Sequence, residues 1–390
     1  MKVPLIVSVN RYYFDHNATT PVCPEAANAL AEAAATLWGN PSSVHRDGQL
    51  VRSRLDKARR QVAGLLSCPP KRIVFTSGGT EAANLAILGS VRASAAARRH
   101  VITSSIEHPA VLSACAQLER EGVEVSYLPV DSRGLVDPDN VRRQIRPNTV
   151  LISCMHANNE TGVVEPIAEI SAIARERGIL FHSDGVQATG KIPVSLDQFQ
   201  PDLYSLSAHK FYAAKGSGAL YIRPGLELQP IQYGGRHEAA FRPGTENVPG
   251  ILAMGAAAAA VTDSTRIAAL RDRLEAAILD GVPDVSVNGA GAPRTPNTTN
   301  LCFEGIEGEA MVIALDLKGF AVSTGAACSS GAVKASHVLL AMGLTEARAK
   351  SSLRFSLGRY NDEGQVDALV DAVAGAAAHL RRLSPTYAHA

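Results

Sequence analysis

The stretch Ser205-Leu206-Ser207-Ala208-His209-Lys210 ends an apolar strand pattern on a lysine, and Asp184-Gly185-Val186-Gln187 precedes it along the chain. A lysine placed after small hydroxyl residues can condense with an aldehyde cofactor. A carboxylate at the end of an apolar strand can hold a pyridine nitrogen protonated. The two segments therefore predict that Lys210 and Asp184 bind pyridoxal phosphate.

Taken alone, Lys210 would be an ordinary solvated lysine, but its surroundings favour a shielded position. It stands between a strand pattern and the glycine-rich Lys215-Gly216-Ser217-Gly218. Desolvation there would lower the pKa of Lys210 towards nucleophilic competence. Ser207 and His209 flank it as possible phosphate ligands.

Apolar runs at 72–76, 100–103, 125–130, 150–153 and 178–181 alternate with helical patterns. That alternation predicts an α/β fold with a mainly parallel sheet flanked by helices. From about residue 262 the pattern changes to a charged helix followed by isolated strands and helices, which is typical of α+β structure. We expect a large domain at 21–261, and a small α+β domain formed by 1–20 and 262–390.

The bulk composition excludes several classes of protein. The chain has 390 residues, of which 46% are hydrophobic and 19% charged, and its formal net charge is +1. Disorder is therefore not expected, and no overall field would attract nucleic acid or an anionic membrane. The apolar N-terminal run of 1–9 is too short for a signal-peptide core or a membrane span. Six cysteines without a C-x-x-C pair predict reduced thiols in a cytoplasmic protein.

A possible phosphate site follows the first apolar strand, at Thr76-Ser77-Gly78-Gly79-Thr80-Glu81. The glycines allow close backbone approach, and free amides at a helix start together with the Thr80 hydroxyl can bind an anion. In isolation, a glycine turn with a threonine helix cap is the better interpretation. The context of Lys210 favours phosphate at Gly79 and Thr80.

The segment Gly185-Val186-Gln187-Ala188-Thr189-Gly190-Lys191-Ile192 nearly matches a nucleotide P-loop. Ile192 stands where the motif needs a magnesium-binding hydroxyl, and Ile192-Pro193-Val194 is not a helix start. We therefore reject ATP binding here. Asp184 and Gln187 are better explained as partners of the cofactor ring nitrogen and phenolic oxygen, although an aspartate before glycine also forms turns.

His108 and Cys328 complete the candidate groups. His108 could stack on a flat ring or shuttle protons, whereas a capping or buried histidine is the alternative. Cys328 lies in Ser323-Thr324-Gly325-Ala326-Ala327-Cys328-Ser329-Ser330-Gly331, and such small residues favour a loop that can move its thiol. We expect no metal site, because the histidines and cysteines lack the local spacing of metal ligands.

An ordered series of motifs spans nearly the whole chain. It comprises Phe14-Asp15-His16-Asn17-Ala18-Thr19-Thr20-Pro21, Gly39-Asn40-Pro41-Ser42-Ser43-Val44-His45, Ser77-Gly78-Gly79-Thr80-Glu81, Glu107-His108-Pro109, His156-Ala157-Asn158-Asn159-Glu160-Thr161-Gly162, His182-Ser183-Asp184-Gly185-Val186-Gln187, Ser207-Ala208-His209-Lys210, Arg242-Pro243-Gly244-Thr245, the Cys328 loop and Leu353-Arg354-Phe355-Ser356. In this series the chain resembles the cysteine desulfurases of the NifS/IscS type. These enzymes are fold-type I, pyridoxal-phosphate-dependent members of the class V aminotransferase group.

The resemblance implies a role for each matching residue. Lys210 would carry the cofactor and Cys328 would receive the sulfur. His108 would stack on the ring, and Asn158 and Arg354 would bind the substrate carboxylate. The remaining cofactor contacts would come from Gly79, Thr80, Asn158, Asp184, Gln187, Ser207, His209 and, across a homodimer, Thr245.

The activity implied by the resemblance is removal of sulfur from L-cysteine, which gives L-alanine and a persulfide on Cys328. A sulfur-acceptor protein, such as a scaffold for iron–sulfur cluster assembly, would then take the sulfur. Two alternatives remain open. One is a selenocysteine lyase or other class V enzyme in which Cys328 is incidental, and the other is a catalytically idle sulfur carrier.

Overall fold

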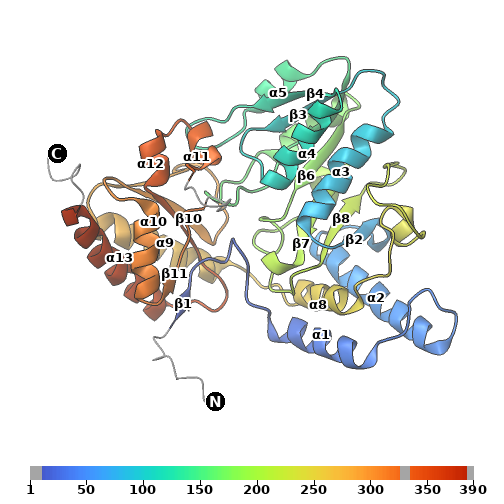
Figure 1. Ribbon diagram of the computed structural model, residues 1–390, viewed down its shortest axis with the longest axis horizontal. Coiled ribbons are helices and arrows are strands. Elements are labelled where there is room, and N and C mark those ends of the chain that lie inside the picture. Colours follow the sequence, from blue (N-terminus) through green and yellow to red (C-terminus); the bar gives the residue numbers. More distant parts are fainter. Residues whose placement is uncertain (1–10, 326–333, 384–390) are drawn as a thin grey trace.

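The structure is a computed structural model that describes residues 11–325 and 334–383. Its largest sheet has seven strands in the order β2-β8-β7-β6-β5-β3-β4 (Figure 1). Strand β8 runs antiparallel to both neighbours, whereas β3 to β7 pair in parallel. The mainly parallel sheet predicted from the alternating apolar runs is thereby confirmed. The strands are β2 (Ile73–Thr76), β3 (His100–Ser104), β4 (Glu124–Leu128), β5 (Thr149–Ser153), β6 (Leu180–Asp184), β7 (Leu203–Ser207) and β8 (Gly218–Ile222).

Helices bury both faces of this sheet. In β5, Leu151 packs with the helices α3 and α4, whereas the next residue, Ile152, belongs to the core on the opposite face. Such two-sided burial explains why the strands are nearly continuous apolar runs. The helices of this part are α1 (Pro24–Thr36), α2 (Arg46–Leu65), α3 (Gly79–Ala93), α4 (Pro109–Arg120), α5 (Pro138–Gln144), α6 (Ile167–Glu176), α7 (Leu196–Phe199) and α8 (Val248–Ala259), with 3-10 turns η1 (Pro70–Arg72), η2 (Ala208–Lys210) and η3 (Glu238–Ala240).

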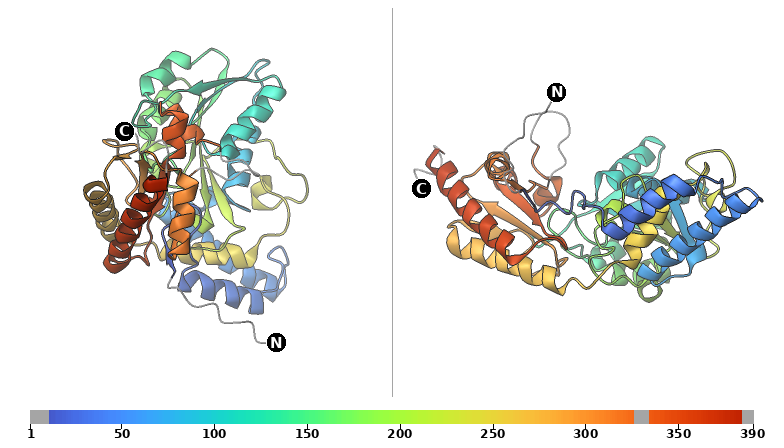
Figure 2. Two further views of the ribbon diagram at one scale, coloured as in Figure 1. Left: turned by 60° about the vertical axis from the view of Figure 1, so that its left-hand side comes forward. Right: turned by 90° about the horizontal axis from the view of Figure 1, so that it is seen from below.

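The C-terminal part builds a separate core around an antiparallel sheet of order β12-β10-β9. Figures 1 and 2 show this part beside the large sheet, with α9, α10 and α13 packed around its own strands. Its elements are α9 (Thr265–Gly281), β9 (Val285–Val287), β10 (Thr298–Phe303), α10 (Gly308–Leu317), β11 (Phe320–Ala321), α11 (His337–Ala341), α12 (Glu346–Lys350), β12 (Ser352–Ser356) and α13 (Glu363–Leu383).

The N-terminal segment packs with this second part. Strand β1 (Tyr12–Tyr13) pairs in parallel with β11, and Phe14 is buried in the same core as α9 and α13. These contacts support our proposal that 1–20 and 262–390 form one domain and 21–261 the other. No helix within the described ranges is long and apolar enough to cross a membrane.

The turn after β6 leaves no room for a side chain at Gly185. A Cβ there would lie 1.9 Å from Cζ of the fully buried Tyr204. We expect Gly185→Ala to lower the free energy of unfolding by about 3 kcal/mol, since neither the ring nor the strand beneath it can move freely. Urea denaturation of the purified chain would measure this change.

Gly64→Ala is the matched control, because no atom lies within 4 Å of a Cβ at Gly64 in α2. There the same substitution should stabilise the protein by roughly 0.5–1 kcal/mol. Equal effects at both positions would contradict the steric argument.

Candidate active site

A cavity of about 640 Å³ opens where the parallel strands β3, β5, β6 and β7 have their carboxyl ends. In α/β folds this edge of the sheet is where ligands commonly bind. Nearly all the predicted site residues within the described ranges line it, namely Gly79, Thr80, His108, Asp184, Gln187, Ser207, His209, Lys210 and Arg354. Residues from distant parts of the sequence thus meet in one place.

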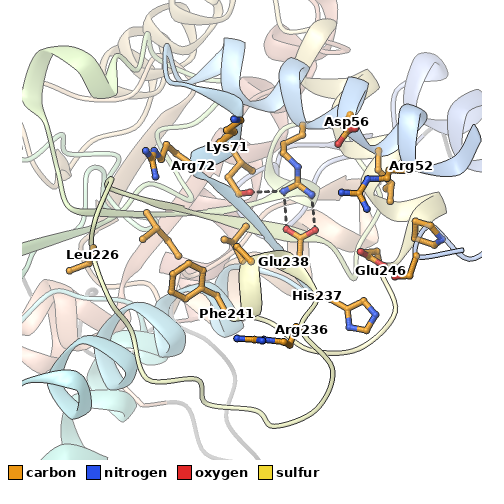
Figure 3. Close-up of a pocket in the computed structure, with 18 of the residues that line it drawn as sticks. Arg52, Asp56, Lys71, Arg72, Leu226, Arg236, His237, Glu238, Phe241 and Glu246 are labelled. Carbon is orange, nitrogen blue, oxygen red and sulfur yellow. Dashed lines mark hydrogen bonds and ion pairs between the residues drawn. The ribbon is translucent and has the colours of Figure 1, made fainter. Parts of the chain in front are cut away.

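A larger cavity of about 760 Å³ lies elsewhere, between α2 and the segment that contains η3 (Figure 3). Two of the charged groups that line it are paired with each other, since Arg59 donates to both carboxylate oxygens of Glu238, at 2.7 and 2.8 Å. None of the predicted site residues that the structure describes lines it. Size alone therefore does not identify the functional cavity.

Lys210 lies in the 3-10 turn directly after β7, at the mouth of the first cavity. Its Nζ donates hydrogen bonds to the carbonyl oxygens of Asn17 and Ala18, at 2.6 and 2.7 Å. Desolvation, followed by repulsion from Arg354, lowers the pKa of Lys210 to about 8. A neutral, nucleophilic amine is therefore accessible near neutral pH.

Asp184 ends β6 and is only 6% exposed. Its Oδ1 accepts a hydrogen bond from the Val186 amide at 2.9 Å. Burial raises the pKa of the Asp184 carboxyl, while His108 and Lys210 act in the opposite direction. A further cation in the cavity would favour the ionised carboxylate.

His108 both caps a helix and lines the cavity. Its Nδ1 accepts a hydrogen bond from the Ala110 amide at the start of α4, and desolvation lowers the pKa of the ring. The capping role that we considered as an alternative thus coexists with a position where the ring can face a ligand.

The start of α3 has the features of an anion site. Gly78 precedes the helix, and no side chain caps it. A Cβ at Gly79 would lie 2.7 Å from Val186 Cγ2 and 3.4 Å from Ser207 Cβ, so a side chain there would fill the space between the loops. Thr80 is exposed, and His209 shares a hydrogen bond with Thr19 Oγ1 at 3.1 Å. These groups can hold a phosphate without competition from an internal cap.

Arg354 lies in the middle strand position of β12 and is 4% exposed. It donates to Asp15 Oδ1 at 2.7 Å and to the carbonyl of Asn159 at 2.8 Å. Its Nε has no hydrogen-bond partner within the described residues. A guanidinium that lines the cavity is suited to a carboxylate ligand.

Asn158 lies apart from the other predicted site residues. It does not line the cavity, and its Oδ1 accepts from the amides of Glu160 and Thr161 at 2.9 and 3.0 Å. Its Nδ2 donates to the Ile106 carbonyl. The side chain therefore shapes the loop, and the neighbouring Asn159 lines the cavity instead. Two adjacent asparagines cannot be distinguished by a motif, because only the loop conformation decides which one points inwards.

The two remaining predicted residues lie apart from this cavity or beyond the described ranges. Thr245 is exposed and does not line the cavity. Cys328 lies outside the described residues. Among the residues that are described, no group of three or more histidine, cysteine, aspartate or glutamate side chains could hold a metal ion.

The sequence analysis gave no role to Asn17 or Lys191. Asn17 lines the cavity, and its carbonyl oxygen accepts from Lys210 Nζ and, at 3.0 Å, from Gln187 Nε2. Asn17 belongs to the N-terminal motif Phe14-Asp15-His16-Asn17-Ala18-Thr19-Thr20-Pro21. That motif contributed to the family resemblance, but it gave no contact or role for Asn17 itself. Nothing in the sequence shows that a main-chain carbonyl so early in the chain meets Lys210.

Comparison with known proteins identifies the family of this chain. The description "Aminotransferase class-V" matches residues 12–369. The chain belongs to the class V aminotransferase family. A cysteine desulfurase from Nostoc sp. (strain PCC 7120) is 45% identical over 381 residues, which cover 96% of this chain and 94% of the relative.

Solved structures of similar chains agree with the fold. A NifS-like protein superimposes with a TM-score of 0.89 at 34% identity, covering 95% of this chain and all of the other. SspA in complex with cysteine gives a TM-score of 0.81 at 35% identity, covering 90% of this chain and 99% of the other. The family resemblance inferred from the motifs is thereby confirmed, and class V aminotransferases generally depend on pyridoxal phosphate.

The lowered pKa of Lys210 predicts its reactivity in this class V aminotransferase. Without added cofactor, the rate at which trinitrobenzenesulfonate labels Lys210 should rise about tenfold per pH unit below 8 and level off above it, because only the neutral amine reacts. Peptide mapping after short labelling would give the rate, and Lys210→Ala is the control. A rate that still rises steeply at pH 10 would contradict the proposed desolvation.

Proposed function

We propose that this protein is a cysteine desulfurase, which removes sulfur from L-cysteine to give L-alanine and a persulfide on Cys328. The observation that carries the proposal is the meeting of Lys210, Asp184 and Arg354 at one cavity. Relatives named cysteine desulfurase, similar over nearly the whole length, support the same activity.

The residues at the cavity fit pyridoxal phosphate as the cofactor. The uncapped start of α3 with Gly79, Thr80, Ser207 and His209 suits the phosphate. Asp184 suits a protonated ring nitrogen, and Gln187 suits the phenolic oxygen. When bound, the cofactor supplies an electron sink for bonds broken at the amino-acid Cα. Thr245 would serve the phosphate of the partner subunit in a homodimer.

The chain's own groups account for the remaining steps. Arg354, which lines the cavity, binds the cysteine carboxylate, because a planar guanidinium can offer paired hydrogen bonds. Asn159, and not Asn158, is the asparagine that lines the cavity together with Arg354. The Lys210 amine takes the Cα proton once it is free, which its lowered pKa permits near neutral pH. His108, which lines the cavity, would stack on the cofactor ring and can hold a proton at its Nε2, since its Nδ1 accepts from the Ala110 amide.

Sulfur transfer follows from thiolate chemistry. The Cys328 thiolate attacks the substrate sulfur, a sulfur–sulfur bond forms, and the carbon–sulfur bond breaks. The electron pair of that bond stays with the carbon, which is protonated to become the methyl group of alanine. The persulfide then passes to an acceptor protein, for which we propose an iron–sulfur scaffold in the cytoplasm.

The decisive experiment measures alanine and sulfide released from L-cysteine in the presence of a reducing thiol and pyridoxal phosphate. The unaltered protein should release both in equal amounts, while Cys328→Ser and Lys210→Ala should each lose at least 99% of the rate, about 3 kcal/mol of transition-state stabilisation. Full activity of Cys328→Ser, especially on selenocysteine, would favour a lyase. An unaltered protein without cofactor absorbance or product would favour an idle sulfur carrier.

The two asparagines should separate structure from catalysis. Asn158→Ala leaves the amides of Glu160 and Thr161 without their acceptor and should lower the free energy of unfolding by about 3 kcal/mol. Asn159→Ala keeps its main-chain bonds and should change stability by less than about 1 kcal/mol, but slow alanine release roughly tenfold. Urea denaturation and the alanine assay give both values, and the reverse assignment would restore Asn158 to the site.

A further inference from the structure

Lys191 is a basic residue next to the cavity to which the proposed reaction gives no role. It belongs to the segment after β6 that nearly matches a P-loop, but its side chain points to amide groups. Its Nζ donates to Asn17 Oδ1 at 2.7 Å and also to Gln187 Oε1. Both acceptors are oxygens of side-chain amides whose residues line the cavity, whereas Lys191 itself does not.

These bonds fix which way the Gln187 amide points. An amide has a carbonyl end that accepts and an NH₂ end that donates. Because Lys191 occupies the carbonyl end, the NH₂ end lies on the side of Lys210, where Nε2 donates to the Asn17 carbonyl at 3.0 Å. Gln187 is 5% exposed, so few other partners can compensate if this orientation is lost.

Asn17 is held in the same way. Its Oδ1 accepts from Lys191 and from Asn297 Nδ2, and its Nδ2 therefore donates, at 2.8 Å to Thr298 Oγ1 and at 3.1 Å to the Asn159 carbonyl. The Asn17 carbonyl, in turn, accepts from Lys210. Lys191 thus bonds the side-chain amides of two residues that line the cavity.

The protonation state of Lys191 does not alter this geometry. Desolvation, followed by repulsion from Lys210 and Arg354, lowers its pKa. A neutral amine still has two N–H groups, which is the number needed for two amide oxygens. Lys191 also lines a small cavity of about 20 Å³ together with His16, Lys210 and Tyr212.

We propose that Lys191 is a positioning residue, which orients the Gln187 amide so that its N–H groups, and not its carbonyl, face the phenolic oxygen of the cofactor. The inference rests on the proposed function, because it requires pyridoxal phosphate at this site. A flipped amide would set a carbonyl oxygen against a cofactor oxygen, which repels instead of binding.

The test is a double-mutant cycle on cofactor affinity. The dissociation constant of pyridoxal phosphate is measured by absorbance titration of cofactor-depleted full-length protein. Lys191→Met should weaken binding about tenfold, equivalent to the net free energy of about one hydrogen bond. In a Gln187→Met background the same change should cost less than about twofold, because Lys191 then has no amide to orient at that position.

Three outcomes of the cycle contradict the proposal: no loss in either background, an equal loss in both, or a loss only without Gln187. Lys318→Met is the matched control, since Lys318 bonds a main-chain carbonyl of α13 far from the cavity and should leave affinity unchanged. Urea denaturation of the same cofactor-depleted proteins reports whether folding is affected.

If Lys191→Met does not fold, Lys191→Gln replaces it. This side chain keeps an N–H end but is one atom shorter and cannot reach both oxygens, so an intermediate loss of about threefold is expected, again only with Gln187 present. A loss of equal size without Gln187, or none at all, overturns the inference. If the unaltered protein neither binds the cofactor nor releases alanine, the proposed function itself is wrong. That result is distinguishable from a failure of the Lys191 inference alone, in which the unaltered protein still binds the cofactor.

Discussion

The hydrogen bonds of Asn17 are the constraint on which the site depends. Its main chain meets Lys210 and Gln187 from the large sheet, and its side chain meets Asn297 and Thr298 from the second core. Asn17 is 2% exposed, and an unpaired amide in such a place costs about 1–3 kcal/mol. The two parts of the chain are therefore joined where the cofactor residues converge.

The burial of the residues that converge here also shifts the pKa values of the charged groups in the cavity. Desolvation raises the pKa of Asp184 and lowers that of Lys210. The difference between these two pKa values is therefore smaller than for a carboxylate and an amine in water. Groups whose pKa values approach one another exchange protons at small energetic cost. Arg354 has Asp15 as its counter-ion, at 2.7 Å.

The sequence predicted the fold class because two-sided burial leaves a direct trace in runs such as 100–103 and 150–153. It also predicted Lys210, Asp184 and Gln187, because residue type and position after a strand are both visible in a sequence. It could not show that Asn159 and not Asn158 lines the cavity, since the choice between two adjacent amides depends on a loop conformation. It could not reveal Lys191 as a partner of Gln187, because a lysine after Thr189-Gly190 has many equally plausible surroundings.

The pairing of the two chain ends also bears on how the protein is made. Asp15 and Arg354, which hold each other beside the cavity, are 339 residues apart, and β1 completes its sheet only with β11. Contacts at such separation form late, since loop-closure entropy opposes them until the intervening segments are folded. During synthesis, the large sheet can assemble as residues up to about 260 emerge, but the arginine site cannot. The nascent chain is thus unable to hold an amino-acid substrate until translation is almost complete.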